Sequence, residues 1–175
     1  DSGIEEAFSK ATAVLISVGP NEEGDPVFLR YNKLFEKYAA NLDWVGYLST
    51  TGVYGDFNGQ WVDEATPLNP QTKRGQLRLS AEQGWQSISD LPMHIFRLAG
   101  IYGPDRGPFS KVRSGTAKRI IKKGQVFSRI HVDDIAQVLL ASLNAPNPRQ
   151  VYNVCDNDPA PPQDVIGYAA ELLGL

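Results

Sequence analysis

Short apolar runs alternate along this chain with longer segments whose apolar residues recur at helical spacing, and this alternation narrows the possible folds more than any other feature. The short runs indicate buried strands that end near turn-forming residues; they are AVLISV (13–18), DWVGYLS (43–49), MHIFRLA (93–99) and VYNV (151–154). The amphipathic segments indicate helices; they cover about residues 27–38, 73–89, 133–145 and 161–174. Strands that alternate with helices predict a doubly wound α/β fold, in which helices cover both faces of a parallel sheet.

Two long stretches, residues 55–72 and 100–126, show neither pattern. In open α/β sheets, the loops that follow the carboxyl ends of the strands usually build the ligand site. We therefore expect a single domain over residues 1–175, with a small substrate-side region built from about 100–126 and 156–175.

The composition argues against several classes of partner. The 175 residues carry a net charge of −3 and are 42% hydrophobic and 21% charged, so they offer no field that recruits nucleic acid or an anionic membrane. No apolar run approaches the roughly 18 residues that span a bilayer. The single cysteine, Cys155, lies in the apolar run VYNVC, so we expect a buried thiol and a reducing, cytoplasmic compartment. The expected partner is a small molecule, and a homodimer is possible.

One motif of dinucleotide-binding sheets is absent from these residues. Such a sheet opens with a strand and a G-x-G-x-x-G or G-x-x-G-x-x-G turn, which brings a helix N-terminus to the pyrophosphate. The nearest matches, GVYG (52–55) and GIYG (100–103), follow later strands. We therefore expect AVLISV to be the fourth strand of a longer parent fold that also extends past the C-terminus. We also expect residues 1–175 alone not to bind a dinucleotide tightly.

Several longer motifs together resemble one family. They are YLSTTGVYGD (47–56), DEATPLNP (63–70), FRLAGIYGP (96–104), RIHVDDIAQVLLASL (129–143) and VYNVCDN (151–157). In this order they are similar to the extended short-chain dehydrogenase/reductases, which include NAD-dependent nucleotide-sugar epimerases and dehydratases. More narrowly, they resemble the YeeZ-like atypical branch. The resemblance implies a Rossmann-type fold, NAD or NADP as cofactor, and oxidoreductase chemistry.

The catalytic positions of that family carry unusual residues here. The family's hydroxyl falls on Thr50, three residues before Val53, and its tyrosine and lysine fall on Arg74 and Arg78, counted back from Glu82. An arginine stays charged and cannot cycle a proton. The resemblance therefore implies that Arg78 keeps the lysine's cationic role at the nicotinamide ribose, while Arg74 does not replace the tyrosine.

The residues themselves leave alternatives open for these positions. Arg78 and Glu82 could form an exposed i, i+4 ion pair, or Arg74 and Arg78 could bind one anion between them. The hydroxyl of Thr50 could have a purely structural role, in which it caps the end of its strand and has no part in a site. Tyr54 or Tyr102 could replace the missing acid.

The resemblance also implies a cofactor edge at the ends of three strands. Its expected residues are Ser17, Val18, Gly19, Pro20, Leu48, Ser49, Arg78, Leu98, Ala99 and Gly100. His131 is expected to be structural, and we expect no metal. Where nucleotide-sugar enzymes usually carry an arginine, four residues before this histidine, the chain has Phe127. That difference weakens the nucleotide-sugar interpretation.

Two functions are compatible with this pattern. One is an NAD(P)-dependent oxidoreductase of the epimerase/dehydratase type with an unknown small-molecule substrate, for which an anion is one alternative. The other is a non-catalytic NAD(P)-binding sensor or scaffold. The choice between NAD and NADP depends on a residue after the second strand of the parent fold, which these residues do not include.

Overall fold

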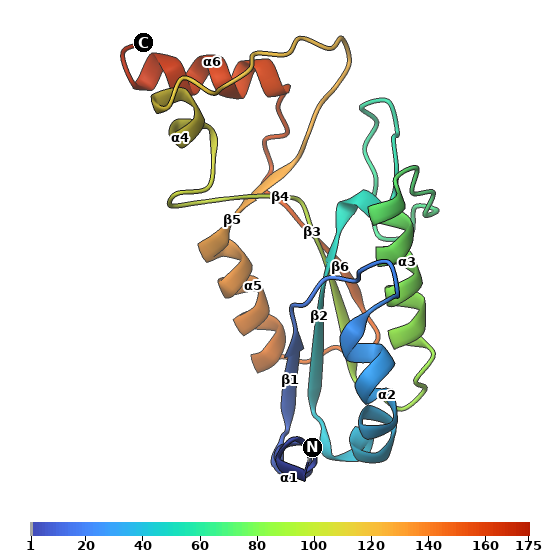
Figure 1. The fold of residues 1–175 in the computed structure, drawn as a ribbon. Coiled ribbons are helices and arrows are strands. Elements are labelled where there is room, and N and C mark those ends of the chain that lie inside the picture. The colour runs from blue at the N-terminus through green and yellow to red at the C-terminus, as the bar shows by residue number, and fades with distance from the viewer. Residues whose placement is uncertain (1) are drawn as a thin grey trace.

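The computed structural model describes residues 2–175 (Figure 1). In chain order the elements are α1 (Ser2–Lys10), β1 (Ala13–Ile16), α2 (Pro26–Tyr38), η1 (Ala39–Asn41), β2 (Trp44–Thr50), η2 (Thr51–Val53), α3 (Lys73–Gln86), β3 (Met93–Leu98), β4 (Gly100–Tyr102), α4 (Pro108–Arg113), β5 (Arg129–His131), α5 (Val132–Asn144), β6 (Val151–Val154) and α6 (Pro162–Leu172).

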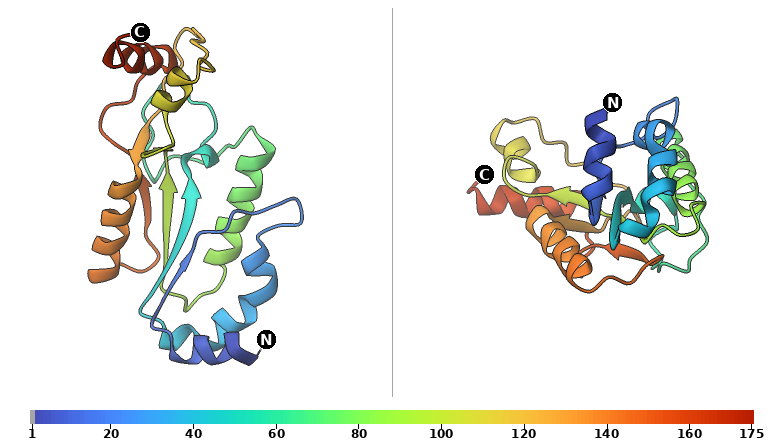
Figure 2. Two further views of the ribbon diagram at one scale, coloured as in Figure 1. Left: turned by 60° about the vertical axis from the view of Figure 1, so that its left-hand side comes forward. Right: turned by 90° about the horizontal axis from the view of Figure 1, so that it is seen from below.

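Four strands form a parallel sheet in the order β1-β2-β3-β6. Helices α2 and α3 cover one face of this sheet and α5 covers the other, as Figure 2 shows. The predicted doubly wound α/β fold is therefore confirmed. A second, two-stranded parallel sheet pairs β4 with β5. Helix α4 follows β4 and helix α6 follows β6, and the two helices pack together beyond the carboxyl ends of the main strands (Figure 1).

Local sequence explains where the main helices begin. Asp25 caps α2 by accepting hydrogen bonds from the amides of Val27 and Phe28, and proline occupies the first turn. Thr72 caps α3 in the same way, through the amide of Gly75. Helix α1 and the short elements β4, β5 and α4 were not predicted.

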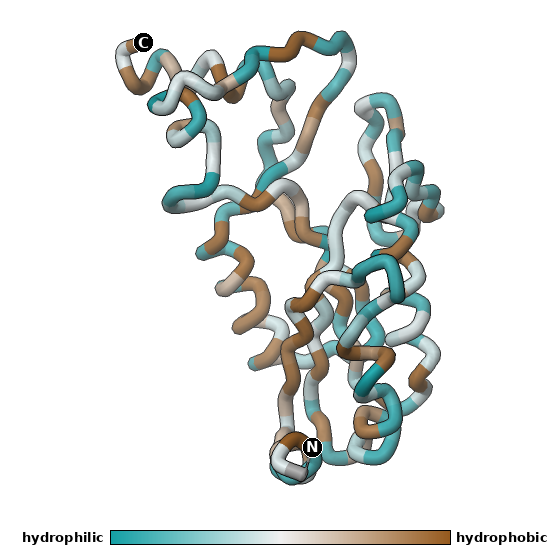
Figure 3. The backbone as a smooth tube through the Cα atoms, in the orientation of Figure 1, coloured by the Kyte–Doolittle hydropathy of each residue, from teal (hydrophilic) through white to brown (hydrophobic). Residues whose placement is uncertain are grey.

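The core lies on both faces of the sheet, and the strands and α5 carry its hydrophobic stretches (Figure 3). On the face of α2 and α3, the fully buried Trp85 packs against Phe28 and Phe35, and its indole N–H donates to Asp25 at 3.1 Å. On the face of α5, Trp44 and Phe96 pack together. Within residues 2–175, no helix has the length and apolar character required to cross a membrane.

Candidate functional site

The carboxyl ends of β1, β2 and β3 meet at one edge of the sheet, because the strands are parallel. Beyond this edge lies a cleft of about 1740 Å³. Its walls come mainly from residues 51–62, 100–113, 122–131 and 153–169. Both long stretches that the sequence assigned to the ligand site contribute to these walls.

Arg78 joins two parts of the predicted cofactor edge. Its Nη1 donates to the carbonyl oxygen of Leu48 at 2.8 Å and to the hydroxyl of Tyr47 at 3.1 Å. Its Nη2 lies so close to Gly19 that a Cβ added there would be 3.0 Å away. The guanidinium therefore binds the end of β2 and lies beside the loop after β1, where an added side chain would require it to shift.

The charge state of the Arg78–Tyr47 contact is set by its surroundings. Burial raises the pKa of the Tyr47 hydroxyl, although the neighbouring Arg78 opposes the shift, so Tyr47 stays a neutral phenol. The Nε of Arg78 is buried and has no hydrogen-bond partner among the described residues. One donor of a permanently charged group is thus left without a partner in this part of the protein.

Arg74 lies apart from this contact. It is exposed in the first turn of α3 and forms no hydrogen bond or ion pair with any described residue. Neither Arg74 nor Arg78 lines the cleft. The anion site between the two arginines stays a prediction, since the structure gives them no shared pocket.

Thr50 occupies the end of β2 and caps the short helix η2. Its Oγ1 accepts a hydrogen bond from the amide of Gly52 at 3.2 Å. This is the structural capping role that the sequence left open as an alternative. Alternation along β2 assigns Thr50 to the face of Leu48, whereas Arg78 contacts Tyr47 on the other face. A role shared by Thr50 and Arg78 therefore requires a ligand that extends over the end of the strand.

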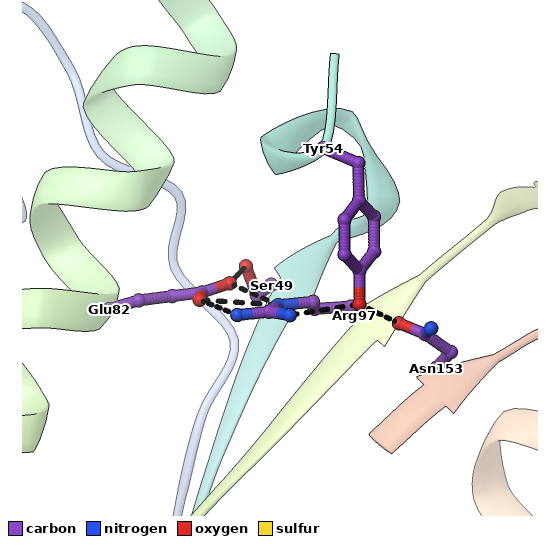
Figure 4. Close-up of polar contacts among 5 residues, drawn as sticks. All are labelled: Ser49, Tyr54, Glu82, Arg97 and Asn153. Carbon is purple, nitrogen blue, oxygen red and sulfur yellow. Dashed lines mark hydrogen bonds and ion pairs between the residues drawn. The ribbon is translucent and has the colours of Figure 1, made fainter. Parts of the chain in front are cut away.

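A buried ionic network underlies the edge, and the sequence did not reveal it (Figure 4). Glu82, only 1% exposed, accepts hydrogen bonds from the Ser49 hydroxyl and from Arg97, whose Nη2 lies 2.8 Å from Oε2. Arg97 also donates to the Tyr54 hydroxyl at 2.9 Å, and Tyr54 donates to Asn153 at 2.7 Å. The network thereby joins α3 to β2, β3, β6 and the residue after η2.

This network bears on three interpretations from the sequence. Glu82 is buried against Arg97 and is not the exposed partner of Arg78. The hydroxyl of Ser49 is 4% exposed and bound to Glu82, so its side chain faces the interior and not a cofactor. The hydroxyl proton of Tyr54 is likewise donated to Asn153, which removes Tyr54 as a free acid. A charged residue inside the fully buried strand MHIFRL was the signal that could have revealed the pair.

The other residues predicted for the cofactor edge differ in solvent exposure. Those in the loop after β1 lie at the surface, and those at the end of β3 are buried. Ser17, Val18 and Gly19 are exposed and Pro20 is half-buried, Leu98 and Ala99 are each 6% exposed, and Gly100 is exposed and lines the cleft.

Both histidines have structural contacts. His131 caps α5, because its Nδ1 accepts a hydrogen bond from the amide of Asp133 at 3.2 Å, and its ring packs edge-on against Tyr102. His94 is buried, and its Nε2 accepts a hydrogen bond from the amide of Asn147. No group of three or more potential metal-binding side chains occurs among residues 2–175.

Cys155 is exposed, so the expectation of a buried thiol was wrong. Strand β6 ends at Val154 and lies at the edge of the sheet, so the following residue is not enclosed. Partial burial of the thiol and the carboxylates of Asp156 and Glu64 raise the pKa of Cys155.

We expect Cys155 to react with iodoacetamide more slowly than free cysteine at neutral pH, because the thiolate is the nucleophile and its raised pKa lowers the thiolate fraction. Alkylation rates followed by mass spectrometry test this expectation. Asp156→Asn should increase the rate, whereas a wild-type rate above that of free cysteine would rule out the assigned environment.

Comparisons with known proteins identify the family. The family model for the NAD dependent epimerase/dehydratase family matches residues 33–155. Protein YeeZ of Escherichia coli K12 is 30% identical over 181 residues, which cover the whole of this chain and 64% of that protein.

Solved structures share the fold. A functionally unknown conserved protein from Silicibacter pomeroyi superposes with a TM-score of 0.93 at 61% identity, covering 96% of this chain and 60% of that one. The dTDP-glucose 4,6-dehydratase of Bacillus anthracis, solved with NAD, superposes with a TM-score of 0.81 at 20% identity, covering 99% and 61%. The chain therefore spans 60–64% of the length of these three proteins.

The chain belongs to the NAD-dependent epimerase/dehydratase family. The predicted family and the similarity to YeeZ are both confirmed.

Proposed function

We propose that the protein is an NAD(P)-dependent oxidoreductase of the epimerase/dehydratase type, whose cofactor lies along the edge formed by Gly19, Leu48 and Arg78. The observation that carries this proposal is the position of Arg78. It stands at the family's lysine position, and its guanidinium binds the end of β2 and lies beside the loop after β1. The NAD bound to the Bacillus anthracis dehydratase supports the choice of cofactor.

The residues of this edge fit a dinucleotide. Gly19 lies beside the guanidinium of Arg78, so a ligand that reaches this guanidinium also meets the backbone of the loop after β1. The buried, unpartnered Nε of Arg78 offers a donor for a ribose oxygen or a phosphate. When bound, the dinucleotide would supply hydride transfer.

The chain's own residues would then bind and orient the ligands. Arg78 would hold the cofactor but cannot exchange a proton. Both tyrosines considered as acids line the cleft. Tyr54 is 2% exposed and donates its hydroxyl hydrogen to Asn153, whereas Tyr102 is half-buried. The Tyr102 hydroxyl forms no hydrogen bond with the described residues, so we propose Tyr102 as the candidate proton donor.

Titration of the complete natural protein with NADH and NADPH tests the proposed cofactor site. At least one dinucleotide should bind, and Arg78→Ala should weaken it about tenfold or more, because a charge-assisted hydrogen bond contributes about 1.5–3 kcal/mol. Arg74→Ala is the matched control, one helical turn away and exposed. Absence of binding, or equal affinity in Arg78→Ala, would reject the site.

A non-catalytic cofactor sensor is the second candidate, and the exposed Arg74 at the family's tyrosine position favours it. The two functions differ in turnover. A sensor would bind the dinucleotide without oxidising or reducing any member of a broad carbonyl and alcohol panel, whereas the enzyme should change the absorbance of the nicotinamide with at least one of them.

A further inference from the structure

Large apolar side chains converge on the cleft although solvent reaches them. Five of these side chains line the cleft and are exposed to solvent. They are Trp61 (79% exposed), Phe109 (42%), Val126 (38%), Phe127 (49%) and Tyr168 (63%). They come from the loop after η2, from α4, from the segment before β5 and from α6. A concave site lined by exposed aromatic groups is typical of ligand pockets.

The charges of the same walls cancel. Five cationic and five anionic side chains line the cleft, so its formal charge is zero with His131 neutral; they are Arg106, Arg113, Lys122, Lys123 and Arg129, and Asp56, Asp105, Asp156, Asp158 and Asp164. A site for a diphosphate concentrates positive charge. The walls of this cleft carry no net positive charge.

Arg129 is held by the protein itself. Its Nη1 donates to the carbonyl oxygen of Phe127 at 2.9 Å and to that of Ala160 at 3.3 Å. The main chains of Phe127 and Ala160 also pair with each other at 3.2 Å in both directions. These contacts hold the backbone at Phe127 in place. They also occupy the Nη1 of Arg129 with carbonyl oxygens of the protein.

The loop that carries Trp61 is anchored as well. The carboxylate of Glu64 accepts a hydrogen bond from the amide of Asn153 in β6 at 2.7 Å. Near the tip, a Cβ added to Gly59 would lie 3.1 Å from the carbonyl oxygen of Gly124, so the loops from the two walls meet there. The apolar side chains thus sit on a largely preformed frame.

We propose that the cleft binds an uncharged substrate with an aromatic or alicyclic ring and no phosphate group. The inference rests on the proposed function and names its substrate class. The ring replaces water against the five apolar side chains, and the balanced charges leave no excess cation for a diphosphate. Phe127 and Trp61 are then the specificity-determining residues.

Tryptophan fluorescence tests the proposal directly, because Trp61 is exposed while Trp44 and Trp85 are 4% and 0% exposed. The probes are 2-acetonaphthone, an uncharged aromatic ketone, and UDP-glucose, both used on the complete natural protein without cofactor. We expect 2-acetonaphthone to protect the exposed tryptophan from acrylamide quenching and UDP-glucose to leave it accessible. Trp61→Phe should remove the protected component.

Phe127→Ala should weaken binding of 2-acetonaphthone about fivefold to tenfold, and Phe127→Leu should weaken it less. Ile121→Ala is the matched control, since Ile121 is 70% exposed nearby in the chain but does not line the cleft. Circular dichroism of each variant shows whether it is folded.

Protection by UDP-glucose alone, or an unchanged affinity in both Phe127 variants, would overturn the substrate class. Because these measurements need no dinucleotide, their failure is distinct from a failure of NAD(P)H to bind.

Discussion

Replacing Glu82 with alanine should lower the free energy of unfolding by about 3–5 kcal/mol, because the change leaves a buried guanidinium without its counter-charge. Arg97 is 4% exposed, and Glu82 accepts hydrogen bonds from its Nε and Nη2. The Ser49 hydroxyl loses its acceptor in the same variant. Urea denaturation followed by circular dichroism measures the loss.

Gln83→Ala supplies the control for this prediction. Gln83 neighbours Glu82 on α3 but is exposed, so its replacement should change the free energy of unfolding by less than about 0.5 kcal/mol. A double replacement of Glu82 by leucine and Arg97 by methionine should recover part of the loss, since it removes both buried charges. If Glu82→Ala is as stable as Gln83→Ala, the network does not hold the strand ends together.

Gly55→Ala should destabilise the protein by about 2–4 kcal/mol through backbone strain and a steric clash. Gly55 has a φ of 86°, and an added Cβ would lie 2.1 Å from the carbonyl oxygen of Asn69. Asn69 closes the base of the 55–72 loop by donating its amide to the carbonyl of Tyr54 at 3.2 Å. Opening this contact should also release Trp61 from the cleft wall and weaken binding of 2-acetonaphthone.

Limited proteolysis distinguishes a local opening from general unfolding. In Gly55→Ala, cleavage should begin within residues 55–72, while the sheet stays protected. Gly52→Ala is the control, because its added Cβ meets only ordinary contacts with Thr50 and its φ is not positive. An uncut loop with normal stability in Gly55→Ala would show that the base of the loop does not depend on this glycine.

Periodicity predicted the frame of the molecule well. The strands at 44–50 and 93–98 and the helices at 73–86 and 132–144 lie within a few residues of their expected positions, because burial on a sheet or along a helix face repeats in the sequence. Elements of three residues, such as β4 and β5, carry no such period. They depend on a partner far away in the chain, as Tyr102 does on His131.

The candidate site was less accessible from sequence. The spacing from Glu82 assigned Arg78 to the cofactor edge, which stays a prediction, although its guanidinium does contact the end of β2. The spacing could not show that Glu82 pairs with Arg97, because that contact joins α3 to β3 in space. Cys155 was misjudged because its apolar neighbours gave no indication that β6 is an edge strand. The apolar cleft also depends on tertiary structure, since its walls come from four separate stretches.

A crystal structure of the complete natural protein with NADH or NADPH bound is the most direct test of the proposed cofactor edge. We expect a dinucleotide along the loop that contains Gly19, with the nicotinamide ribose or a phosphate within hydrogen-bond distance of Arg78 and the nicotinamide facing the cleft. A dinucleotide bound elsewhere, or one that leaves Arg78 in contact only with Tyr47 and Leu48, would contradict it.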